Sequence, residues 1–151
     1  MDWTIIQQAL PAYGHGFVLT VWLSLVGIIG SIIVGVIASL LQYFKTPILS
    51  QIATAYVELA RNTPLLIQLF FLYYAFPVIG WRMSSITAGI IGLIFLGGGY
   101  MAEGFTGGFQ GVTDSQINSG EALGMNRFQL ARYIVFPQGF ALSMPALAAN
   151  V

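Results

Sequence analysis

Side chains that could do chemistry are scarce in this sequence. Its 151 residues include five Lys and Arg, five Asp and Glu, one His and no Cys. His15 has no second histidine with which to bind a metal, and without cysteine there is neither thiolate chemistry nor a disulfide framework. The carboxylates are scattered along the chain. The sequence therefore argues against an enzyme and predicts no metal site and no cofactor on this chain.

One group of charges stands beside strongly apolar runs. Glu58 and Arg61 precede an uncharged run at 62–81, and Glu103 ends another at 83–102. Glu58 and Arg61 are three apart, on one face of a helix, where they can pair. If the two runs cross the membrane in opposite directions, an Arg61–Glu103 contact is within reach. Ionisable residues at membrane depth usually face protein or water, so these charges are either interfacial anchors or the lining of a cytoplasmic gate.

The elements that must position these charges are membrane spans. The chain is 57% apolar and 7% charged, contains 18 glycines and has a mean hydropathy of +0.83, a composition typical of membrane proteins. A span needs about 20 mostly apolar residues, which predicts spans at 17–41, 48–78 and 85–103. A fourth apolar segment at 133–151 contains two prolines, so we expect it to be broken. All of this forms one domain, 1–151.

The few basic residues predict the orientation. Lys45, Arg127 and Arg132 fall in loops that would share one side of the membrane, and Arg82 falls on the other. Because cytoplasmic loops are enriched in Lys and Arg, we expect the N-terminus outside. Asp2 and the absence of a basic leader argue against a cleaved signal peptide.

Small residues mark two of the spans. A stripe at spacings of three and four follows one face of the first span: Thr20, Ser24, Gly27, Ser31, Gly35 and Ser39. Such stripes let helices approach closely in lipid, within this chain or against another subunit. Three consecutive glycines at 97–99 predict either close packing or a bend beside a translocation path.

The segment at 110–136 is the most informative loop. Asp114 or Ser115 can cap a short helix over 116–123, and Gly124 suits a left-handed position at its end. Asn126 can then cap a second helix through Phe136. This helix–glycine–helix segment is either a docking surface or an amphipathic turn on the bilayer.

Four motifs in register resemble the membrane subunit of ABC importers for polar amino acids, of the histidine, glutamine, glutamate and arginine type. They are R-N-T-P-L-L-I-Q-L at 61–69, preceded by Tyr56 and Glu58, then Y-M-A-E at 100–103 followed by two glycines, the loop at 116–125, and the F-P-Q and M-P pairs at 136–138 and 144–145. The resemblance implies an all-α integral membrane protein with a MetI-like fold. It also implies a permease in the cytoplasmic (inner) membrane of a prokaryote.

The same resemblance implies partners. The loop at 116–127 would be a coupling helix that fits a separate ABC ATPase subunit, which binds the ATP and magnesium. This agrees with the lack of a G-x-x-x-x-G-K-S/T phosphate loop in the sequence. A second permease subunit, identical or homologous, and an extracytoplasmic amino-acid-binding protein complete the expected assembly. Zero net charge gives no reason to expect nucleic acid.

The resemblance also implies three sets of site residues. The ATPase contact would comprise Gln116, Asn118, Ser119, Gly120, Glu121, Ala122, Leu123, Gly124, Met125 and Arg127. The gate or pathway candidates are Glu58, Arg61, Thr63, Gln68, Tyr73, Gly98, Tyr100 and Glu103. The binding-protein contact would comprise Phe76, Pro77, Trp81 and Arg82.

The sequence departs from the family pattern in several places. Asn118-Ser119-Gly120 stands where the family has Glu-Ala-Ala, and Thr106 stands where an arginine is usual. The three glycines replace positions that often carry hydroxyl or amide groups. The chain also stops at Val151, where relatives continue through another helix, so we expect a truncated product, a fragment or a shortened relative. The alternatives to a permease are a small oligomeric channel, a non-transporting membrane scaffold or a truncated remnant.

Overall fold

The computed structural model describes residues 3–149, and every regular element within them is helical, which confirms the all-α fold class. Asp2 and Val151, on which two of the expectations rest, lie outside the described residues. The elements are α1 (Trp3–Tyr43), α2 (Leu49–Asn62), α3 (Leu65–Phe70), η1 (Phe71–Ala75), η2 (Phe76–Ile79), α4 (Ser85–Gln110), α5 (Asp114–Ala122), α6 (Arg127–Leu130), η3 (Ala131–Val135) and α7 (Phe136–Ala148).

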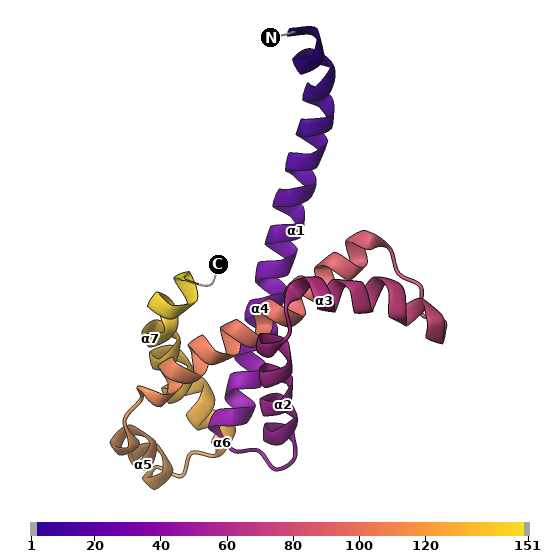
Figure 1. The fold of residues 1–151 in the computed structure, drawn as a ribbon. Helices are drawn as coiled ribbons and strands as arrows, with labels where there is room; N and C mark the ends of the chain where they lie inside the picture. Colours follow the sequence, from indigo (N-terminus) through magenta and orange to yellow (C-terminus); the bar gives the residue numbers. More distant parts are fainter. Residues whose placement is uncertain (1–2, 150–151) are drawn as a thin grey trace.

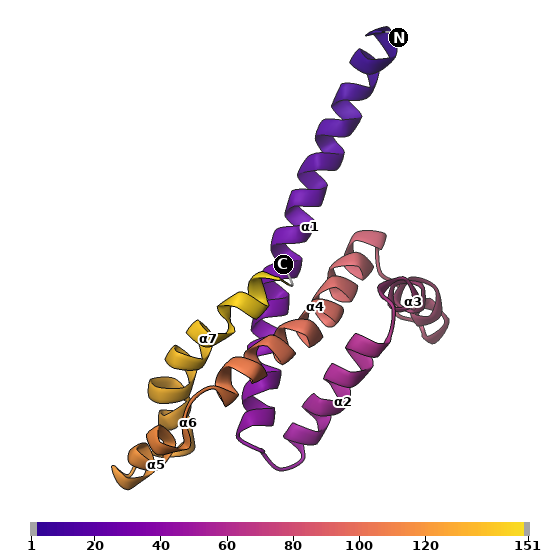
Figure 2. The same cartoon turned by 60° about the vertical axis from the view of Figure 1, so that its left-hand side comes forward.

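Helix α1 is the long axis of the molecule. It runs for 41 residues without interruption and includes Pro11, so it begins 14 residues before the span expected at 17–41. The N-terminal half extends well beyond the other helices, while the C-terminal half lies among them (Figures 1 and 2). The other helices therefore pack around one half of α1 only.

The small-residue stripe on α1 packs against α4 along the C-terminal half of α1. The Ser31 hydroxyl donates a hydrogen bond to the Leu93 carbonyl at 3.3 Å, and both Ser31 and Ser39 are buried. A Cβ added at Gly35 would lie only 2.9 Å from the Ala102 backbone nitrogen, so glycine is required there. Thr20, on the projecting half, is exposed. The stripe thus serves packing within this chain over about half of its length.

The span expected over 48–78 is sharply bent, because α2 and the segment from α3 to η2 meet at an angle of 105°. Pro64 lacks a backbone N–H and restricts the residue before it to an extended conformation. Thr63 accordingly has φ −109° and ψ 121° and ends α2. After the bend, α3 continues into a π-helical turn and a 3₁₀ turn that ends at Gly80, with φ 91°.

Helix α4 continues through the glycine triplet at 97–99 and ends at Gln110, beyond the expected Glu103. Its start is capped by Ser84, whose hydroxyl accepts a hydrogen bond from the Thr87 backbone N–H at 3.1 Å. A Cβ on Gly98 would press on Val34 of α1 at 2.9 Å and on the Tyr56 hydroxyl of α2. The triplet therefore lets α4 approach two helices closely, and α4 stays α-helical through it.

Within the described residues, α1 and α4 are long and apolar enough to cross a membrane, and the bent pair from α2 to η2 would be a third span if it counts as one. The second loop helix does not stop at Phe136 as expected, but passes through the π-helical turn η3 into α7. Pro137 stands in the first turn of α7, where a missing N–H is tolerated, and Pro145 lies inside the helix. Helix α7 packs against α4 around buried Phe105, Phe109 and Leu147.

Candidate functional site

The polar centre of the molecule is an ion pair between α2 and α4. Arg61 Nη2 lies 2.6 Å from Glu103 Oε2, which confirms the contact expected between the two apolar runs. The Arg61 guanidinium also lies over the ring of Tyr100, at 5.6 Å from its centroid. The side chains of Arg61 and Glu103 are 37% and 56% exposed, so the pair is open on one side. Among the described residues, Arg61 therefore pairs across helices with Glu103, and not along α2 with Glu58.

The side-chain amide of Gln68 stabilises the bend between α2 and α3. Gln68 is 7% exposed, and its Nε2 donates to the carbonyls of Ala60 at 3.0 Å and Thr63 at 2.9 Å. These carbonyls end α2 and have no partner inside the helix. Gln68 and Thr63, both expected along the pathway, thus lie at the bend itself, where Gln68 links the two helices.

The other pathway candidates do not share one surface. Gly98 is buried between α1 and α2, whereas Tyr73 lies on the flank formed by α3 and η1. An open groove of about 520 Å³ does lie beside the bend. Its lining residues are Leu59, Thr63, Ile67, Gln68, Phe71, Leu72, Phe76, Ile91 and Phe95. The lining is almost wholly apolar, so the groove offers little to a polar solute.

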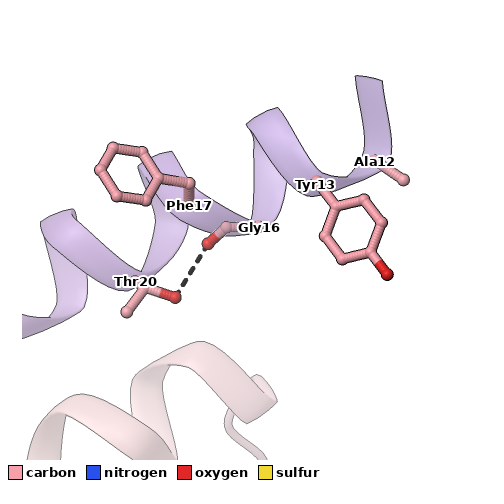
Figure 3. A pocket seen from close by; sticks show the side chains of 5 residues that line it. All are labelled: Ala12, Tyr13, Gly16, Phe17 and Thr20. Atoms are coloured by element: carbon pink, nitrogen blue, oxygen red, sulfur yellow. Dashed lines mark hydrogen bonds between the residues drawn. The ribbon is translucent and has the colours of Figure 1, made fainter. Parts of the chain in front are cut away.

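A second hollow, on α1, carries no site chemistry. It is lined by Ala12, Tyr13, Gly16, Phe17 and Thr20, all from this one helix (Figure 3). The Thr20 hydroxyl donates to the Gly16 carbonyl at 2.9 Å, so it is used within the helix. Within the described part of the chain, no group of three His, Cys, Asp or Glu side chains could hold a metal ion.

The loop between α4 and α7 is folded as two short helices. Asn126 caps α6 in a reciprocal arrangement with Gln129, and both hydrogen bonds measure 2.9 Å. Gly124 takes the left-handed conformation that the sequence predicts, with φ 78°. The expected cap of α5 is wrong, because Thr113 holds the N-cap position without a side-chain hydrogen bond and Asp114 is already helical.

Most of the expected ATPase contact is on the surface of this loop. Gly120 is buried, because its Cα faces the side chains of Leu130 and Ile134, and Met125 is half-buried. The remaining residues of the set are exposed: Gln116, Asn118, Ser119, Glu121, Ala122, Leu123, Gly124 and Arg127. Phe128 was not expected in this set, yet it is 73% exposed, and Leu123 is 79% exposed. The signal in the sequence was an aromatic residue two positions after the cap Asn126.

Arg127 has an intramolecular partner as well. Its Nη1 donates to the Phe44 carbonyl at 3.2 Å, across 83 positions of sequence. The loop thus touches the turn between α1 and α2, and both lie at the end of the molecule opposite the N-terminus (Figures 1 and 2).

The expected binding-protein contact lies on the connection between α3 and α4, away from the α5–α6 loop (Figures 1 and 2). Trp81 and Arg82 are exposed there, whereas Phe76 and Pro77 are half-buried. The Phe76 ring packs against the rings of Phe71 and Trp81. The role of this patch stays a prediction.

Comparison with known proteins gives consistent results. Residues 31–151 match the model of the family described as binding-protein-dependent transport system inner membrane component. The chain is 34% identical over 149 residues to a probable amino-acid permease protein, YxeN, of Bacillus subtilis (strain 168), covering 97% of this chain and 66% of the relative. It is 29% identical over 148 residues to the glutamine transport system permease protein GlnP of Escherichia coli (strain K12), covering 97% of this chain and 68% of the relative.

The fold is also similar to a solved structure. The crystal structure of an amino acid ABC transporter with histidines superposes with a TM-score of 0.81 at 27% identity, covering 99% of this chain and 70% of that chain. The chain spans about two thirds of the length of the curated relatives that it matches. Since the family model covers residues 31–151, the chain belongs to the family of binding-protein-dependent transport system inner membrane components.

Proposed function

We propose that this chain is the permease subunit of an ATP-driven importer of polar amino acids. The family match and the names of the relatives, which include an amino-acid permease and a glutamine permease, support this function. Polar amino acids, rather than one named amino acid, are the proposed substrate class. ATP and magnesium would bind to a separate ATPase, and an extracytoplasmic binding protein would deliver the substrate.

The observation that carries this proposal is the folded loop over 116–127. A loop with a complete capping box and a left-handed glycine between its helices has a defined shape, as a docking element must. Leu123 and Phe128 present exposed apolar side chains on it, and aromatic side chains are enriched in protein interfaces. We therefore assign the ATPase contact to this surface.

The Arg61–Glu103 pair is the best candidate for a gate. It joins the end of α2 to α4 and stays open on one side, so it can be broken and remade without unfolding a core. Tyr100 holds the guanidinium from a second direction. We place this pair near the cytoplasmic side of an inner membrane, with the N-terminus outside and a second permease subunit alongside.

Reconstitution tests the proposal. The chain would be placed in proteoliposomes with its ATPase, its partner permease and its binding protein, and uptake of labelled glutamine, glutamate, histidine and arginine would be measured. Uptake should need ATP and should stop when the phosphate-loop lysine of the ATPase is replaced. Flux without any ATPase would indicate a channel instead, and an assembly with neither flux nor bound ATPase would indicate a scaffold.

A further inference from the structure

Arg127 lies where the loop meets the C-terminal end of α1. The last carbonyls of a helix have no partner inside it and are favourable sites for a basic side chain. The hydrogen bond from Arg127 Nη1 to the Phe44 carbonyl, at 3.2 Å, satisfies one such group just past Tyr43, where α1 ends. One N–H group of Arg127 is therefore used in an intramolecular hydrogen bond. This bond joins the α5–α6 loop to the α1–α2 turn.

The turn itself is held in an uncommon conformation. Lys45 and Ile48 have positive φ angles of 46° and 64°, which side chains other than glycine rarely adopt. Such a conformation persists only where the surrounding structure fixes it. Tyr43 and Phe44 supply part of that support, because the Tyr43 ring packs edge-on against Phe109 of α4 and both rings lie against the core that also includes Ile117 of α5.

The same turn is tied to the helices that carry the proposed gate. Gln42, in the last turn of α1, donates to the Thr54 hydroxyl of α2 at 3.2 Å and accepts from the Thr106 hydroxyl of α4 at 3.3 Å. Helix α2 then leads from the turn to Arg61, and α4 carries Glu103. A continuous set of contacts thus runs from the α5–α6 loop, through the turn, to both partners of the ion pair.

We propose that Arg127 is a positioning residue that makes the α5–α6 loop and the α1–α2 turn move as one unit, and that it is not a direct contact to the ATPase. This inference rests on the proposed function. A movement of the loop, imposed by the ATPase, would reach α2 through the Phe44 carbonyl and would change the separation of Arg61 and Glu103.

The test compares three variants in the assembled transporter. Arg127→Met removes the donor, Arg127→Lys keeps a donor and the charge, and Arg132→Met removes an exposed charge from the same segment. Arg132 is a matched control because its contact is local: its guanidinium lies over the ring of the adjacent Tyr133, in the same element. For each variant we would measure the affinity for the ATPase and the number of amino acids taken up per ATP hydrolysed.

We expect Arg127→Met to keep the ATPase affinity within about twofold and to lower uptake per ATP about tenfold, the loss that about 1.4 kcal/mol produces. Arg127→Lys should recover part of the uptake, and Arg132→Met should behave as the unaltered protein. A large loss of ATPase affinity in Arg127→Met with normal uptake per ATP would overturn the proposal in favour of a direct contact. Unchanged values in all respects would overturn it as well.

A distance measurement separates failure of this link from failure of the proposed function. The chain has no cysteine, so spin labels can be placed cleanly at Leu49→Cys in α2 and Ser115→Cys in α5, both exposed. The label separation should stay constant when ATP is added, and Arg127→Met should broaden it even without partner subunits. A separation that changes with ATP in the unaltered protein would refute the link, whatever the transport assay shows. If uptake never requires an ATPase, the proposed function fails while the broadening still tests the contact.

Discussion

The Arg61 side chain lies close to three residues of α4. Its guanidinium pairs with Glu103 and lies over Tyr100, and its Cγ would lie 3.3 Å from a Cβ added at Gly99. The close packing therefore fixes where the stem of Arg61 runs, while the charged end remains free to part from Glu103. A half-exposed ion pair contributes about 0.2–1 kcal/mol, which is small enough for a gate to open repeatedly.

The first prediction concerns this pair. Arg61→Ala should lower ATP-dependent uptake about fivefold, the factor that corresponds to about 1 kcal/mol, whereas Lys45→Ala should leave it nearly unchanged. Exchanging the charges, Arg61→Glu with Glu103→Arg, should restore part of the uptake, because the attraction between α2 and α4 returns. Uptake in proteoliposomes checks this, and equal losses in Arg61→Ala and Lys45→Ala would favour simple interfacial anchoring.

The second prediction concerns Gln68. Gln68→Leu removes the donor from the buried bond to the Ala60 carbonyl and from the part-buried bond to the Thr63 carbonyl. It also removes Gln68 Oε1, a buried acceptor without a partner. A buried unsatisfied group costs about 1–3 kcal/mol, and the two lost bonds outweigh the one group that is relieved. The midpoint of thermal unfolding in detergent should therefore fall by several degrees. Gln110→Leu, at the exposed end of α4, is the matched control and should change the midpoint little. An unchanged midpoint in Gln68→Leu would show that the amide does not hold the bend.

Among the elements, α5 depends on one close approach. A Cβ added at Gly120 would lie 2.5 Å from Leu130 Cδ2 and 2.7 Å from Ile134 Cδ1, so α5 rests directly on α6 and η3. The usual Glu-Ala-Ala positions are Asn118, Ser119 and Gly120, and only the last of them is buried. Gly120 thus shapes the loop, and the exposed residues around it are available to a partner.

The third prediction follows from that packing. Gly120→Trp cannot fit between α5 and α6, so the loop should lose its shape and the ATPase should no longer co-purify, while membrane insertion continues. Ser115→Trp places the same side chain at an exposed position of α5 outside the expected ATPase contact and should disturb the loop far less. Quantifying bound ATPase against permease in purified membranes measures both effects. Normal ATPase binding in Gly120→Trp would remove the loop from the proposed interface.

At the scale of the whole molecule, the chain is drawn out along α1 (Figures 1 and 2). The N-terminus lies at the tip of α1, and the α5–α6 loop lies beside the α1–α2 turn at the opposite end (Figures 1 and 2). The candidate spans α1 and α4 lie between these ends. This arrangement agrees with an N-terminus on one side of the membrane and a docking loop on the other.

The fourth prediction tests the orientation. Single cysteines at Gln7, Lys45 and Ser115 can be introduced into a chain that has none. In intact cells, or spheroplasts where an outer membrane is present, a maleimide that cannot cross membranes should label Gln7→Cys at once. It should label Lys45→Cys and Ser115→Cys only after the membrane is permeabilised. Labelling in the reverse order would invert the proposed topology.

Much of the fold and some of the site could be predicted from residue types and spacing. Uncharged runs of span length predicted the apolar helices, and Asn126 and Gly124 predicted the boundaries of the loop helices. These features depend on near neighbours in the chain, where burial of apolar side chains and capping hydrogen bonds decide the local structure. The contact between Arg61 and Glu103 could be inferred as well, because two antiparallel runs of known length bring both residues to a similar depth.

Only the tertiary structure decided what happens between distant segments. Pro64 signalled a break, but the 105° angle and the Gln68 hydrogen bonds that hold it depend on how α3 packs. The glycine triplet proved to be a packing surface because α1 and α2 both press on α4 there. The hydrogen bond from Arg127 to the Phe44 carbonyl joins residues 83 positions apart. No local sequence pattern predicts this bond, because it forms only once the helices between the two residues have packed together.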